Sequence, residues 1–115
     1  MEATDSGPIR VGVLGAAGRM GRAVADAVYE ADGLTLVAAA DPSAPGSEVN
    51  GVTVAAGVEA LLDADPGLDV VVDFTVVEAS RATLPVLAAA GVHAVVGTSG
   101  LGDDDLATLR DVFRT

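Results

Sequence analysis

The feature that most constrains this fold is an apolar run that ends in regularly spaced glycines. Residues 9–21 read I-R-V-G-V-L-G-A-A-G-R-M-G, so that Gly15, Gly18 and Gly21 lie three residues apart, and a helical pattern follows at once. A helix start exposes N–H groups that lack intrahelical partners at the positive end of the helix dipole. Because glycine carries no side chain to block them, the pattern predicts a site for a phosphate or pyrophosphate.

Composition limits the classes of partner and of bound group. The chain has 115 residues, enough for one small domain, and a formal net charge of −11 with no lysine. Nucleic acid and anionic membranes are therefore disfavoured as partners, because phosphate contacts need Lys and Arg. An anionic cofactor would have to be held mainly by backbone N–H groups and a few arginines. The absence of cysteine excludes disulfides and thiolate metal sites, and we expect no metal.

The first eight residues, M-E-A-T-D-S-G-P, differ in character from the rest of the chain. They are polar and acidic and lack the basic and apolar regions of a signal peptide. No apolar run elsewhere is long enough to span a bilayer. We therefore expect a disordered tail at residues 1–8, a dinucleotide-binding domain at residues 9–115 and a cytoplasmic protein.

The apolar periodicity predicts strands that alternate with helices. Strands are expected at residues 9–14, 34–40, 52–55, 68–74 and 92–96. Helices are expected at residues 18–31, 58–64, 78–90 and 103–113, and a loop is expected at residues 43–51. Pro85 should kink the third helix or delay its start. This order predicts a Rossmann-like α/β fold, a doubly wound parallel sheet in three α/β/α layers, truncated because the chain stops before a sixth strand.

Asp41 strengthens the case for a nucleotide site. It closes the second predicted strand just before Pro42, where a carboxylate can accept hydrogen bonds from the two hydroxyls of an adenosine ribose. The alternative is that Asp41 is a turn residue before proline. The glycine turn alone is a weak signal, because Ala17 stands where G-x-G-x-x-G has its second glycine, and a purely structural turn is its alternative. The two features together favour a nucleotide.

Two further segments follow predicted strands. Asp73-Phe74-Thr75 and Gly97-Thr98-Ser99-Gly100 each come directly after an apolar run. Carboxyl ends of parallel strands meet at one edge of the sheet, and ligands of open α/β sheets bind along that edge. Each segment alone is typical of loop chemistry, but jointly they fit a cofactor that lies across the edge.

Three motifs point to a family. G-A-A-G-R-M-G at residues 15–21, D-F-T at 73–75 and V-V-G-T-S-G at 95–100 resemble the amino-terminal domain of dihydrodipicolinate reductase, also called 4-hydroxy-tetrahydrodipicolinate reductase. The resemblance covers the chain after Pro8. It implies an oxidoreductase that reduces an unsaturated cyclic dicarboxylate with NADH or NADPH in the diaminopimelate and lysine pathway.

The resemblance also implies roles for individual residues. The glycine turn would wrap the pyrophosphate, Asp41 would hold the adenosine ribose, and Phe74 and Thr75 would flank the middle of the cofactor. Gly97, Thr98 and Ser99 would reach the nicotinamide and the substrate. Ser99 replaces a usual threonine but keeps the hydroxyl, so it would also contact a substrate carboxylate. The cofactor-binding residues implied are Gly15, Ala16, Ala17, Gly18, Arg19, Met20, Asp41, Phe74, Thr75, Gly97, Thr98 and Ser99.

The same comparison predicts a preference for NADH. Pro42 stands where some members carry an arginine for the 2′-phosphate of NADPH, and Asp41 would repel that phosphate. Arg19 could contact the 2′-phosphate and partly offset that repulsion, so the preference is expected to be modest, with NADPH as the weaker ligand.

The family's substrate and tetramerisation domain, with its histidine pair and lysine, is not in this sequence. We therefore expect no catalytic residue here, and dicarboxylate binding only together with that domain. His93, at a strand start, is expected to be structural or solvent-facing. The chain alone should bind nucleotide weakly and turn nothing over, and an unpaired sheet edge should permit a homo-oligomer.

Three alternatives remain open at this point. One is the cofactor domain of another two-domain dehydrogenase, of the aspartate or homoserine type, which the downstream sequence would distinguish. Another is a non-catalytic CoA- or NAD-binding module, which ligand choice would distinguish. The third is a structural fragment whose crevice does not close.

Overall fold

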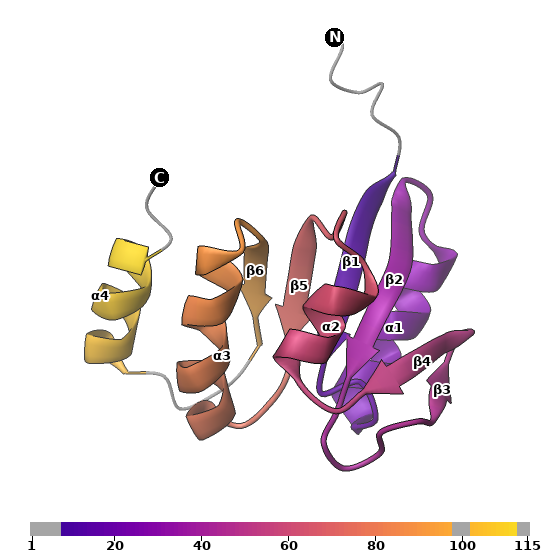
Figure 1. Cartoon of the computed structure of the whole chain (residues 1–115), viewed down its shortest axis with the longest axis horizontal. Coiled ribbons are helices and arrows are strands. Elements are labelled where there is room, and N and C mark those ends of the chain that lie inside the picture. Colours follow the sequence, from indigo (N-terminus) through magenta and orange to yellow (C-terminus); the bar gives the residue numbers. More distant parts are fainter. Residues whose placement is uncertain (1–7, 98–101, 113–115) are drawn as a thin grey trace, which may run out of the picture.

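The computed structural model of the chain describes residues 8–97 and 102–112. Within these ranges strands and helices alternate in the predicted order, with one short extra strand (Figure 1). The elements are β1 (Ile9–Leu14), α1 (Arg19–Glu30), β2 (Leu34–Ala40), β3 (Glu48–Val49), β4 (Val52–Ala55), α2 (Val58–Ala64), β5 (Val70–Asp73), α3 (Val77–Ala89), β6 (His93–Val96) and α4 (Asp103–Val112). Thr98 and Ser99, two of the predicted site residues, lie outside the described residues.

The strands form one six-stranded sheet in the order β3-β4-β2-β1-β5-β6. β1 pairs in parallel with β2 on one side and with β5 on the other, and β4 and β6 extend the sheet in parallel. The chain thus winds away from β1 first in one direction and then in the other. This is the strand order of a doubly wound sheet, whose crevice at the reversal point is where ligands bind.

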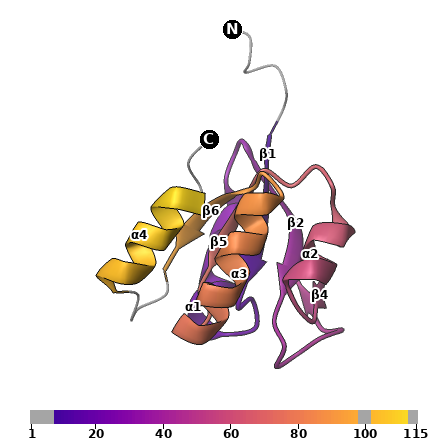
Figure 2. The ribbon, with the colours of Figure 1, turned by 60° about the vertical axis from the view of Figure 1, so that its left-hand side comes forward.

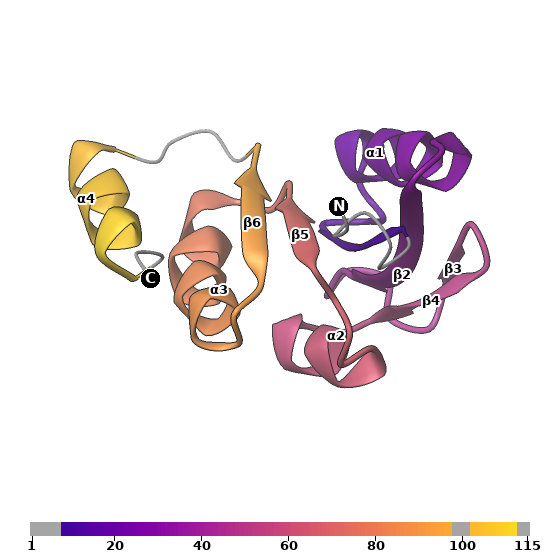
Figure 3. The ribbon, with the colours of Figure 1, turned by 90° about the horizontal axis from the view of Figure 1, so that it is seen from above.

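Helices cover both faces of the sheet, which confirms the predicted three-layer α/β/α fold. Figure 3 shows α1 on one face and α2 with α3 on the opposite face. Figures 1 and 2 both show α4 beside α3, near the β6 end of the sheet. The guanidinium of Arg81 in α3 holds α4 there, with Nε 2.8 Å from Asp105 Oδ1 and Nη2 3.0 Å from Oδ2.

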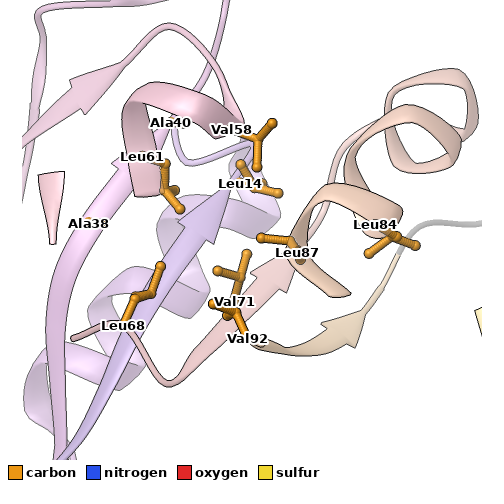
Figure 4. Close-up of a cluster of buried hydrophobic side chains, with 10 residues drawn as sticks. All are labelled: Leu14, Ala38, Ala40, Val58, Leu61, Leu68, Val71, Leu84, Leu87 and Val92. Carbon is orange, nitrogen blue, oxygen red and sulfur yellow. The ribbon is translucent and has the colours of Figure 1, made fainter. Parts of the chain in front are cut away.

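Two apolar clusters fill the space between the layers. Because side chains alternate along a strand, β1 directs Val11 and Val13 toward the α1 side and Leu14 toward the α2 and α3 side. Figure 4 shows the second cluster, in which Leu61 of α2 and Leu87 of α3 are fully buried against the sheet. Small Ala and Val side chains make up much of both clusters, so the helices lie close to the strands.

Most predicted elements agree with the structure, and the loop expected at residues 43–51 is the main error. β1, β2, β4 and α2 have the predicted bounds, whereas β5 and β6 are shorter than predicted. The expected loop contains β3, which pairs antiparallel with β4 through a turn at Asn50 and Gly51. Both residues have positive φ, 51° and 84°, as a two-residue hairpin turn of type I′ requires.

The expectation that Pro85 would delay the third helix was wrong. α3 begins at Val77, and Ser80 N–H already donates to the Val76 carbonyl at 2.9 Å. An interior proline costs a helix about 3 kcal/mol. Leu84 and Leu87, which flank Pro85, are each 0% exposed. Burying two leucines contributes roughly 3–6 kcal/mol, enough to offset the proline.

Arg10 makes polar contacts at the amino-terminal ends of the strands. Its backbone N–H donates to Asp69 Oδ2 at 2.9 Å, and its guanidinium forms an ion pair with Asp65. Asp65 Oδ1 also accepts the Gly67 N–H at 2.8 Å. The hydrogen bond from Arg10, aided by the one from Gly67, outweighs desolvation and holds the pKa of Asp65 below its ordinary value.

Replacing Arg10 with Gln should raise the pKa of Asp65 toward its ordinary value of 3.8. A folded-state pKa below the unfolded one gives stability that is present above the unfolded pKa and is lost as the pH falls through the folded pKa. Carboxyl-detected NMR titrations of the wild type, Arg10→Gln and, as a control, Arg110→Gln would measure the shift. An Asp65 pKa that is equal in all three proteins would contradict this assignment.

Candidate nucleotide-binding site

A cleft opens at the carboxyl ends of the central strands. Its volume is about 300 Å³, and its walls come from three segments that are far apart in the sequence. These are the glycine turn after β1, the residues after β2, and the residues that follow β5. The lining residues are Gly15, Gly18, Asp41, Pro42, Phe74, Thr75, Val76 and Ala79. The structure therefore brings together the first three of the sequence-predicted segments.

Two of the three motif glycines are required by close backbone packing. Gly15 has φ +80°, and a Cβ there would lie 2.8 Å from the Phe74 carbonyl oxygen. A Cβ on Gly21 would lie 2.0 Å from the Gly15 carbonyl oxygen, because the first turn of α1 packs directly on that carbonyl. Gly18 differs, since a Cβ there would meet only the Gly15 oxygen, at 3.4 Å. Gly18 therefore keeps the cleft open, while its two neighbours hold the turn in shape.

The start of α1 is open to an anion. Gly18 is the N-cap and provides no side-chain hydrogen bond, so the N–H groups of Arg19, Met20 and Gly21 have no acceptor within the described part of the chain. The first turn of α1 contains no acidic residue, whereas α2, α3 and α4 each begin with at least one. Unpaired N–H groups and a positive dipole end are what a bound pyrophosphate needs, so these residues fit such a group.

Asp41 joins the glycine turn to the segment after β2. Asp41 as a whole residue is only 8% exposed. Oδ2 accepts the Ala17 N–H at 2.9 Å, and Oδ1 accepts both the N–H and the hydroxyl of Ser43, at 2.9 and 2.7 Å. Burial acts to raise the pKa of Asp41, but the hydrogen bonds from Ser43 and Ala17 together outweigh burial and lower it. Asp41 is thus ionised at neutral pH. Its hydrogen bonds to Ser43 also make it a turn residue before proline, which was the alternative interpretation of the sequence.

Phe74 and Gly97 lie together at the ends of β5 and β6. The Phe74 N–H donates to the Leu14 carbonyl at 3.1 Å, and the Gly97 N–H donates to the Asp73 carbonyl at 2.8 Å. A Cβ on Gly97 would lie 2.2 Å from the Phe74 ring, so only glycine permits this contact. Phe74 and Gly97, two residues predicted at the carboxyl edge of the sheet, are therefore neighbours.

The remaining predicted residues of the turn differ in exposure. Ala16 is fully buried and its N–H donates to the Ala40 carbonyl at 3.3 Å, so only its backbone faces the turn. Arg19 and Met20 are exposed at the first turn of α1. His93 is exposed at the start of β6, at the opposite end of the strand from the cleft.

Two polar residues near the cleft were not assigned from the sequence. Asp73 is fully buried and accepts the Thr75 N–H and hydroxyl at 2.9 and 2.6 Å and the Ser80 hydroxyl at 2.7 Å, which fixes Thr75 between β5 and α3. Ser43 orients Asp41. An Asp followed two residues later by Ser or Thr is the signal that could have identified both arrangements, because it is typical of a side chain that caps a turn.

No helix in residues 8–97 and 102–112 combines the length and apolar character needed to cross a membrane. Within the same ranges, no group of three or more His, Asp or Glu side chains is arranged to hold a metal ion.

Solved structures establish the class of fold. D-galactose-1-dehydrogenase from Rhizobium etli superposes with a TM-score of 0.78 at 24% identity, over 93% of this chain and 34% of that protein. GenD2 from gentamicin A biosynthesis, solved in complex with NAD, superposes with a TM-score of 0.76 at 21% identity, over 93% of this chain and 32% of that protein. At such identities the likeness shows the fold alone, which is a Rossmann-like doubly wound α/β domain.

The family follows from the sequence comparison. Residues 9–115 match the family described as dihydrodipicolinate reductase, N-terminus, and the chain belongs to this family. It is 45% identical, over 90% of its length, to 4-hydroxy-tetrahydrodipicolinate reductase from Beutenbergia cavernae, of which it covers 36%. Further relatives with the same name are 33–42% identical. The resemblance drawn from the three motifs is confirmed, and the chain corresponds to the amino-terminal domain of this reductase family.

Replacing Gly21 with Ala should disrupt the glycine turn, because the new Cβ would be forced into the Gly15 carbonyl. We expect the free energy of unfolding to fall by about 3 kcal/mol, as for other forced overpacking. Gly57→Ala is the matched control: Gly57 is the N-cap of α2, and a Cβ added there would meet nothing within 4 Å. Urea unfolding of both variants tests this, and equal losses of stability would contradict it.

Proposed function

We propose that this chain holds the adenosine and pyrophosphate portions of NADH in the cleft, as the cofactor domain of a 4-hydroxy-tetrahydrodipicolinate reductase. The observation that carries the proposal is the start of α1. It offers free N–H groups and no acidic side chain in its first turn, in a chain of net charge −11. A dianionic pyrophosphate is the chemical group that such an arrangement best accommodates.

The cleft suggests how the cofactor is placed along the sheet edge. The pyrophosphate would lie over Gly18 and receive hydrogen bonds from the Arg19 and Met20 amides. The ribose would meet Asp41, and the apolar surfaces of Pro42 and Val76 line the same cleft where an adenine would be accommodated. The nicotinamide would then extend toward Gly97 and, as the family resemblance implies, toward Thr98 and Ser99.

The whole protein's reaction is part of the proposal. The chain spans little more than a third of the length of the curated relatives, 36% and 40% in two of them. A bound nicotinamide would supply the hydride for reduction of the cyclic dicarboxylate. The residues of this chain would bind and orient that donor, which contributes to the rate by fixing the geometry of the reactants. We assign proton transfer and dicarboxylate binding to the rest of the protein, with Ser99 as the contribution of this chain.

Three expectations from the sequence stay predictions. They are the cytoplasmic location, the inability of this chain alone to turn over substrate, and self-association through the sheet edge. β6 is the last strand in the sheet order and exposes Val95, which is 56% accessible. An edge strand of this kind can pair with a second copy.

NADH should bind more tightly than NADPH. The ionised Asp41 repels a 2′-phosphate, and Pro42, which lacks a donor, cannot compensate. Asp41→Asn removes the negative charge and should narrow the difference between the two dissociation constants by about tenfold, the effect of one hydrogen bond to a charged group. Calorimetric titration of both nucleotides into both proteins measures this. Tighter binding of NADPH by the wild type would contradict the preference.

Gly18→Ala tests the nucleotide site itself. The added methyl group would lie 3.4 Å from the Gly15 oxygen, which the turn tolerates, and Gly18 lines the cleft at the place assigned to the pyrophosphate. We expect NADH affinity to fall by at least about tenfold, because the phosphates can no longer reach the amides, with little change in melting temperature. Gly57→Ala, a change at the glycine N-cap of α2, should leave affinity unchanged. Wild-type NADH affinity in Gly18→Ala would refute the proposed site.

A further inference from the structure

We infer that the Ser43 hydroxyl determines how strongly this cleft discriminates between NADH and NADPH. The inference rests on the proposed function and concerns a residue outside the glycine turn and the D-F-T segment. Its basis is the set of hydrogen bonds made by Asp41, the acidic residue among the described residues that line the cleft.

The acceptor capacity of Asp41 is almost filled by the protein. An ionised carboxylate offers about four lone-pair sites. Three are used, one by the Ala17 N–H on Oδ2 and two by the N–H and hydroxyl of Ser43 on Oδ1. About one site therefore remains, on Oδ2, whereas a ribose diol presents two hydroxyl donors. Asp41 can accept both ribose hydroxyls, as expected from the sequence, only if one of its three protein donors leaves.

The Ser43 hydroxyl is the donor that can leave. The Ala17 and Ser43 N–H groups are fixed by the backbone of the turn and of the segment after β2. The hydroxyl moves by rotation about a single bond, and Ser43 is exposed, so water or a ligand can replace Asp41 as its partner. NADH binding thus competes with the 2.7 Å bond between Ser43 Oγ and Asp41 Oδ1.

The same hydroxyl favours NADPH. While it donates to Asp41, it withdraws negative charge from the carboxylate and weakens the repulsion of a 2′-phosphate. When it turns away from Asp41, it offers that phosphate a donor beside Pro42, which has none. Ser43 therefore weakens NADH binding and strengthens NADPH binding, and it reduces the discrimination that Asp41 alone would produce.

The test compares the NADPH-to-NADH ratio of dissociation constants in the full chain and in single variants. Ser43→Ala keeps the N–H bond but removes the hydroxyl, so the ratio should rise by about tenfold, with NADH binding more tightly and NADPH more weakly. Ser43→Gly should give the same result. Ser47→Ala is the matched control, because the Ser47 hydroxyl lies in the same segment but donates to the Ala44 carbonyl.

The outcomes separate the two proposals. The ratio of affinities for 5′-ADP and adenosine 2′,5′-bisphosphate should shift in the same sense, since these probes occupy only the adenosine end. If Ser43 only stabilises the loop, the variants will weaken both nucleotides equally, and the inference is wrong while the proposed function stands. A wild-type chain that binds neither nucleotide would overturn the proposed function and the inference with it.

Discussion

The packing of the Gly21 backbone on the carbonyl of Gly15 is the contact on which the rest of the site depends. It brings the first turn of α1 against the end of β1, so only residues 15–18 separate the strand from the helix. The same turn places Gly15 against the Phe74 carbonyl and the Ala17 N–H against Asp41. One tight backbone contact thus aligns three strand ends, and the cleft between them follows from that alignment.

Electrostatics then determines what the cleft can bind. A chain of net charge −11 repels anions at long range, but salt screens this repulsion beyond a Debye length of about 8 Å at physiological ionic strength. At contact distance the local groups dominate, and at the start of α1 these are N–H groups, a positive dipole end and the exposed Arg19 and Arg22. Acidic residues begin the other three helices of the described chain but not this one. The local field therefore favours an anion where the overall charge does not.

Sequence reasoning succeeded where structure is local and was incomplete where it depends on tertiary packing. The turn from β1 to α1 was predictable because spacing of apolar residues and glycines determines it within a few residues. β3 was missed although Asn50-Gly51 is a hairpin signal, because β3 has only two residues and follows a stretch rich in Pro, Gly and Ser. The uninterrupted α3 could not be predicted, since the burial of Leu84 and Leu87 that offsets Pro85 depends on the sheet. The partners of Asp41 lie in segments that only the fold brings together, so the sequence indicated the carboxylate but not its limited acceptor capacity.

Amide chemical shifts would show whether the free N–H groups of α1 bind the pyrophosphate. Inorganic pyrophosphate and NADH would be titrated separately into the isotopically labelled chain. We expect the amides of residues 18–21 to shift most with both ligands, and NADH to shift Asp41 and Ser43 in addition. Shifts that leave residues 18–21 unchanged and gather elsewhere, for example at the β6 edge around His93, would contradict it.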